Sequence, residues 1–140
     1  MTMFPSIGIS GTGLNVDEAW IDTIGGNVAN SEDAVSPGAP VYRAQYLDVE
    51  AQPQSVLPTS GDLGAGVEVK SVELGSAKGV LVEDPTNPLA KNGEVEMPDV
   101  SVSHELVSLV EAETSYQANA NVMQHATNAY EAVLGIKVTS

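Results

Sequence analysis

The 140-residue sequence has no cysteine, only five Lys and Arg residues, and no long apolar run. Without cysteine the chain can form neither disulfides nor thiolate metal sites. Five basic residues against 19 acidic ones give a net charge of -14, which argues strongly against nucleic acids and anionic membranes as partners. No stretch approaches the roughly 18 apolar residues of a membrane-spanning helix, and the first residues lack the basic and apolar parts of a cleaved secretion signal.

Aromatic residues make up only 4% of the chain, with one Trp and one Phe. Much of the apolar content is Val and Ala near the two ends rather than in a central run. The sequence therefore predicts a thin core and terminal segments whose folding is incomplete in the isolated chain.

The last third of the chain predicts one long helix over residues 102–134, because no Pro or Gly interrupts it and good helix formers fill it. Asp99 or Ser101 is expected to cap its N-terminus, and Gly135 is a candidate C-terminal stop that the helix could also pass. Apolar residues recur in steps of three and four, which is typical of a surface that packs against other helices. The predicted assembly residues on this helix are Leu106, Leu109, Tyr116, Asn119, Ala120, Met123, Tyr130 and Leu134.

This seam favours a multi-helix wall over a two-stranded coiled coil. Glu113 and Thr127 interrupt it, and neighbouring alanines widen the packing surface. The alternative, one core helix of a four-helix bundle, needs three further long helices that the sequence does not offer.

A second helical seam lies near the N-terminus, where Ile7, Leu14, Ile21 and Val28 recur at intervals of seven. Residues 14–28 predict a helix, whereas the glycines at positions 8, 11 and 13 disfavour one before it and predict that residues 1–13 are flexible. The predicted assembly residues here are Leu14, Trp20, Ile21, Ile24, Asn27, Val28 and Asn30.

Between the two helices the sequence predicts loops and short strands. Residues 31–40 and 52–66 are rich in turn residues, and residues 41–48 alternate with the period of a strand. Two more short strands are expected around residues 67–72 and 80–82, joined by a turn at 75–79, and residues 84–98 form a stiff Pro-containing linker. The predicted fold is α+β: a helical segment at 1–30, a small antiparallel β region with the linker at 31–99, and the long helix at 100–140.

The sequence gives little support for a catalytic function. His104 and His125 lie 21 residues apart on one predicted helix, roughly 30 Å by helical rise, and cannot share a metal ion. No nucleophile elbow, zinc-protease motif or phosphate loop occurs, so we expect no catalytic, metal-binding or cofactor-binding residues and no small-molecule substrate.

Three blocks of the sequence together carry a family resemblance. The first is residues 24–30, Ile-Gly-Gly-Asn-Val-Ala-Asn, followed by Val41-Tyr42-Arg43. The second is Glu105-Leu106-Val107 with Tyr116-Gln117-Ala118-Asn119. The third is the linker at residues 84–100, with Asp84, Pro85, Pro88, Gly93, Met97 and Pro98. Together they resemble the bacterial flagellar basal-body rod proteins, most closely their proximal-rod subunits. The first block is similar to the family's N-terminal signature, with Gly25-Gly26 in place of the usual Ala-Asn, the second to its C-terminal pattern, and the third to the linker of proximal-rod subunits.

The resemblance implies a structural subunit whose terminal helices assemble into a helical tube that spans the periplasm, transmits torque and forms the export channel. It implies export through the flagellum's own type III channel without a cleaved signal peptide. The implied partners are other rod subunits, further copies of the chain, basal-body ring or adaptor proteins and the export apparatus.

Two alternatives remain open. One is another axial subunit of the rod or hook family, against which the linker block argues. The other is a ligand-binding periplasmic module, which would need a pocket lined by converging polar groups.

Overall fold

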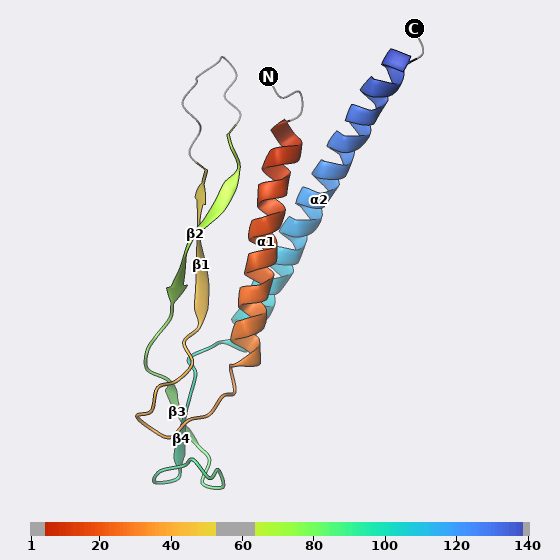
Figure 1. Cartoon of the computed structure of the whole chain (residues 1–140). Helices are drawn as coiled ribbons and strands as arrows, with labels where there is room; N and C mark the ends of the chain where they lie inside the picture. Colours follow the sequence, from red (N-terminus) through yellow and green to blue (C-terminus); the bar gives the residue numbers. More distant parts are fainter. Residues whose placement is uncertain (1–4, 53–63, 139–140) are drawn as a thin grey trace.

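The computed structural model describes residues 5–52 and 64–138, and side chains up to residue 135. Two long helices, α1 (Pro5–Ala29) and α2 (Val102–Val138), flank the strands β1 (Gln45–Ala51), β2 (Val67–Leu74), β3 (Val80–Glu83) and β4 (Glu94–Met97). The helices pack antiparallel as a stem, the β1–β2 hairpin runs beside α1, and β3–β4 lies beyond the end of the stem where α1 finishes (Figure 1). The α+β architecture with terminal helices around a small β region is confirmed.

Helix α1 begins at Pro5, a residue well suited to the first turn because its missing N–H is not needed there. The helix continues through the glycines at 8, 11 and 13 and ends where the Asn30 side-chain amide donates to the Gly26 carbonyl at 2.7 Å. The predicted flexibility of residues 1–13 concerns the free subunit and stays a prediction, and its first four residues lie outside the described part of the chain.

Helix α2 begins where predicted, with Ser101 as its N-cap. The Ser101 hydroxyl accepts a hydrogen bond from the His104 backbone N–H at 3.4 Å, and its carbonyl accepts from Glu105 at 3.0 Å. The helix runs on to Val138, so Gly135 is not its stop. At about 1.5 Å per residue its 37 residues span roughly 55 Å, and it outreaches the 25-residue α1 (Figure 1).

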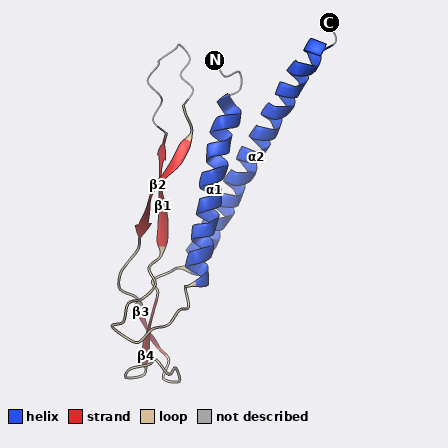
Figure 2. Cartoon of the chain, in the orientation of Figure 1, coloured by secondary structure: helices blue, strands red, loops and turns tan. Residues whose placement is uncertain are grey.

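The strands form two separate two-stranded antiparallel sheets, coloured red in Figure 2, rather than one. β1 pairs with β2 with a bulge at Asp48/Val49, and β3 pairs with β4. Two predictions were therefore wrong: β1 starts at Gln45 rather than at residue 41, and β3 does not pair with β2. The predicted linker contains β4, because Asn92 and Gly93, both at positive φ, reverse the chain into a hairpin.

The buried apolar side chains among the described residues are few and scattered: Ile24, Val41, Ala44, Val95 and Ala112. They lie at the junctions between elements rather than in one central cluster. The prediction of a thin core agrees with this arrangement, and the fold depends strongly on polar contacts at its junctions.

Candidate assembly surface

One group of residues that joins the elements lies where α1 ends and β1 begins. Asn27 of α1 is 1% exposed, and its side-chain amide donates to the Gln45 carbonyl at 2.9 Å while its oxygen accepts from the Gln45 N–H at 2.8 Å. The Tyr42 hydroxyl also donates to that oxygen, at 3.1 Å. Burial, and then the nearby Glu105 carboxylate, raise the pKa of Tyr42, so the hydroxyl stays a donor at neutral pH.

Arg43, the next residue, ties the start of β1 to the end of β2. Its guanidinium donates through Nε and Nη2 to the Gly75 carbonyl, at 3.0 and 2.8 Å, and through Nη2 to the Leu74 carbonyl at 3.2 Å. The N-terminal sequence block thus acts inside the subunit: it docks the β1–β2 hairpin onto α1.

The linker block is a folded hairpin end. The Asp84 carboxylate accepts hydrogen bonds from Thr86 and Asn87 side chains, which lower its pKa. The Asp84 N–H donates to the Gly93 carbonyl at 2.9 Å, which closes the turn. Within this block Pro98 is buried, Asp84, Gly93 and Met97 are half-buried, and Pro85 and Pro88 are exposed.

Glu96 of β4 holds three segments together. Its backbone exchanges hydrogen bonds with Val35 at 2.8 and 2.9 Å, and its carboxylate accepts from the Gly38 N–H at 2.8 Å and the Gly79 N–H at 2.9 Å. These backbone donors, first Gly38 and then Gly79, lower the pKa of Glu96, with a smaller contribution from Lys78. The segment at 31–40, predicted as a loop, is anchored by the Glu96 carboxylate, by the Val35–Glu96 bridge and by the Ser36 hydroxyl, which donates to the Leu89 carbonyl at 2.8 Å.

The contact between the two helices contains buried polar side chains. Ser10 and Asp17 of α1 are each 5% exposed, and Ala112 of α2 is fully buried. The Asn119 amide donates to the Asp17 carboxylate at 2.9 Å. Sequence reasoning missed Asp17 because it followed the apolar repeat; the signal that could have found it is the parallel repeat of Ser10, Asp17 and Ile24 at intervals of seven.

Of the seam predicted on α2, Asn119 makes this polar contact and Met123 lies near Gly11, whereas other members are exposed. Leu109, Ala120 and Met123 are half-buried, whereas Leu106, Tyr116, Tyr130 and Leu134 are between 40% and 51% exposed. On α1, Ile24 and Asn27 are buried within the subunit, and Leu14, Trp20, Ile21, Val28 and Asn30 are half-buried. The stem therefore leaves much of the predicted α2 seam uncovered.

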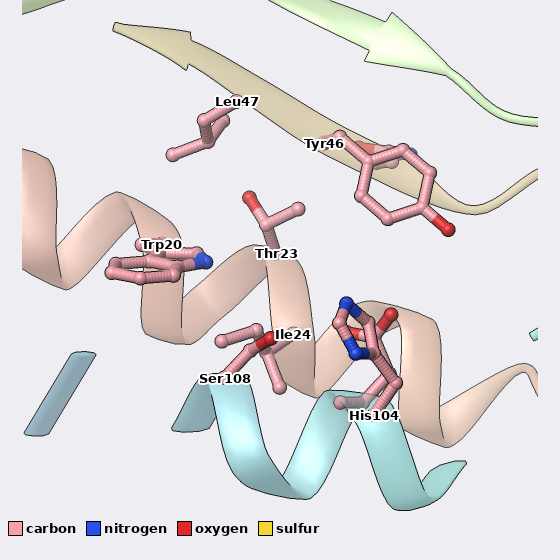
Figure 3. Close-up of a pocket in the computed structure, with 9 residues that line it drawn as sticks. Trp20, Thr23, Ile24, Tyr46, Leu47, His104 and Ser108 are labelled. Carbon is pink, nitrogen blue, oxygen red and sulfur yellow. The ribbon is translucent and has the colours of Figure 1, made fainter. Parts of the chain in front are cut away.

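A cavity of about 230 Å³ separates α1, β1 and the start of α2, lined among others by Trp20, Thr23, Ile24, His104 and Ser108 (Figure 3). Two further hollows measure about 160 and 270 Å³. All three are smaller than the roughly 300 Å³ at which ligand pockets begin. Within the described residues no group of three or more His, Cys, Asp or Glu side chains could hold a metal ion, and no helix is long and apolar enough to cross a membrane.

The chain exposes 9474 Å² of surface, whereas a compact monomer of 14.5 kDa exposes about 6,900 Å². An elongated stem, a thin core and exposed apolar side chains are typical of a subunit that packs against other chains. A protein-family model described as the C-terminal part of the flagellar basal body rod FlgEFG proteins matches residues 91–136, which cover β4 and most of α2.

Relatives with known names specify the class further. The flagellar basal-body rod protein FlgC of Borreliella burgdorferi is 30% identical, over 97% of this chain and 98% of its own length. FlgC of Salmonella typhimurium is 35% identical over 88% and 89%, and FlgC of Bacillus subtilis 30% over 88% and 90%. The chain belongs to the FlgC family of flagellar basal-body rod proteins and is a structural rod subunit of the flagellar basal body.

Proposed function

We propose that the chain builds the proximal part of the rod by packing the apolar seam of α2, together with the half-buried side chains of α1, against helices of neighbouring subunits. The observation that carries this proposal is the exposure of Leu106, Tyr116 and Leu134 on a helix whose polar contact with α1 is made by another residue, Asn119. An uncovered apolar row at helical spacing is stabilised when another helix buries it, at about 25 cal/mol for each Å² removed from water.

The neighbours in this proposal are other rod subunits and further copies of the chain, with basal-body ring or adaptor proteins at the rod's base. The stem helices line an assembly that spans the periplasm, transmits torque and surrounds the export channel, and the subunit reaches it through the export apparatus without a cleaved signal peptide. The role is structural and involves no catalysis or cofactor, which is consistent with the small hollows and with a family of rod components.

The test is Leu106→Asp, with Val107→Asp as its matched control. Both side chains are exposed, at 51% and 58%, so neither change should unfold the subunit, but the two positions point about 100° apart around the helix. A carboxylate on the seam would be buried without a partner in the rod, and we expect Leu106→Asp to abolish swarming while Val107→Asp largely preserves it.

Circular dichroism of both purified variants checks that the helices remain. Normal swarming of cells that carry Leu106→Asp would show that the seam is not the assembly surface. Asp at Leu109 or Met123 is a poorer test, because these residues are half-buried and Met123 lies near Gly11 within the subunit.

A further inference from the structure

The contact between α1 and α2 contains few side chains that could choose one alignment of the helices over another. Its buried members Ser10, Gly13 and Ala112 are small, and Ile24 is a larger buried side chain at the end of the stem where α2 begins. Contacts between small side chains oppose a slip by one heptad only weakly, so a polar pair in the same interface penalises the slip more strongly.

Asp17 and Asn119 supply such a pair. Asp17 is 5% exposed, and its carboxylate accepts from the Asn119 amide at 2.9 Å. The stem helices contain no Lys or Arg before Lys137, so no cation of the stem beside Asp17 can replace this amide. A shift of α2 by one heptad would bring Ala112 or Ala126 opposite Asp17, and neither side chain can donate a hydrogen bond.

Gly13 makes the pair sterically selective. A Cβ at this position would lie 2.6 Å from the Asn119 amide nitrogen, so the side chain of Asn119 occupies the space that glycine leaves. Asn119 is therefore held between a notch in α1 and a carboxylate four residues further along the same helix. Both contacts require the same alignment of the two helices.

We propose that Gly13, Asp17 and Asn119 form a register lock that sets the stagger of α1 against α2. This inference rests on the proposed function: by setting the stagger of the helices, the lock also determines which seam residues of α2 remain exposed for contact with neighbouring subunits. A buried polar pair in a helix interface contributes alignment more reliably than it contributes stability, because an apolar pair of the same volume would hold the helices at least as strongly.

The experiment uses the absence of natural cysteine. Ile24→Cys combined with Ser108→Cys reports the native register, since both side chains line one cavity (Figure 3). Ile24→Cys combined with Ser115→Cys reports a slip of one heptad, and a thiol cross-linker shorter than the roughly 10 Å rise of seven residues separates the two. Each pair is placed in the natural sequence and in a background that carries Asp17→Leu and Asn119→Leu, two substitutions that keep the number and branching of the side-chain heavy atoms.

With Asp17 and Asn119 present, we expect the 24–108 pair to cross-link and the 24–115 pair to remain at background. In the double-Leu background, helicity should persist while the 24–115 yield rises at least several-fold towards that of 24–108. If the double-Leu chain loses its helices, Asn119→Ala is read in the same way and should also raise the 24–115 yield. Cross-linking of only the 24–108 pair in a helical variant would overturn the lock.

A swarm assay of the double-Leu variant with its natural Ile24, Ser108 and Ser115 addresses the assembly step. Loss of swarming together with the shifted cross-link supports the link between register and assembly. Normal swarming with a shifted register would overturn that link, whereas failure of the proposed function itself appears separately, in the Leu106→Asp test.

Discussion

Asn27 and Gln45 are joined by two hydrogen bonds in which one side-chain amide pairs with both backbone groups of a strand residue. The Asn27 amide nitrogen donates to the Gln45 carbonyl at 2.9 Å, and its oxygen accepts from the Gln45 N–H at 2.8 Å. The amide takes the place that a neighbouring strand would occupy beside the first residue of β1. Asn27 was predicted from the sequence as an assembly residue, but its side chain makes these hydrogen bonds within the subunit.

We expect Asn27→Ala to destabilise the subunit by about 1–3 kcal/mol, since it removes the two hydrogen bonds that the buried Asn27 side chain makes with the Gln45 backbone. Asn27→Asp keeps the acceptor but replaces the donor with an oxygen facing the Gln45 carbonyl, so it should also destabilise. Asn30→Ala is the control, because the Asn30 side chain donates to the Gly26 carbonyl at the end of α1 rather than to a strand. Urea denaturation followed by circular dichroism measures all three, and equal midpoints for Asn27→Ala and Asn30→Ala would contradict this role.

The lowered pKa of Glu96 predicts that the folded subunit loses stability in acid. Because hydrogen bonds from Gly38 and Gly79 lower its pKa in the folded state, the stabilisation is fully present above the ordinary glutamate pKa. It decreases as the pH falls through the lowered folded-state pKa, where the carboxylate is protonated. Below both values it is absent.

Glu96→Gln should lower stability at neutral pH, because the single amide oxygen of Gln can replace only one of the two carboxylate oxygens as a hydrogen-bond acceptor. It should also flatten the acid limb of the stability curve, because an amide does not titrate. The measurement is urea unfolding from pH 7 down to pH 3, with amide exchange of Gly38 and Gly79 by NMR. Asp84 also has a lowered pKa, so the difference between wild type and variant isolates Glu96. Parallel curves for the two proteins would show that the carboxylate does not couple these segments.

The start of α2 and the second half of α1 were predictable from the sequence because their signals are local, whereas the first half of α1, from Pro5 to Gly13, was not predicted as a helix. A run without Pro or Gly and the cap at Ser101 define the start of α2 within the chain itself. The pairing of β3 with β4 was not predictable, since Val80 and Met97 lie 17 residues apart and the choice depends on the turn at Asn92 and Gly93. The polar helix contact was missed for a different reason: apolar periodicity predicts which face of a helix is buried, and here much of that face is exposed.

Substitutions at Gly8 and Gly13 distinguish two roles of the N-terminal glycines: flexibility of the N-terminal segment and packing of α1 against α2. They lie in the same helix, but a Cβ added at Gly8 meets nothing within 4 Å, whereas one at Gly13 meets Asn119 at 2.6 Å. Replacing glycine by alanine in an exposed helix stabilises it by up to about 1 kcal/mol. At Gly13 that gain is opposed by displacement of the Asn119 side chain.

We therefore expect Gly8→Ala to raise the helicity of the free subunit and Gly13→Ala to weaken the α1–α2 contact despite its better helix propensity. Far-UV circular dichroism and urea unfolding of the two variants measure this difference in sign.

Export into the medium, measured for each variant in cells, then separates the two roles. If the export channel requires a flexible leader, Gly8→Ala is exported less although its stem is intact. Equal destabilisation by both substitutions would remove the packing role of Gly13, and unchanged export of a more helical Gly8→Ala chain would show that leader flexibility is not what export depends on.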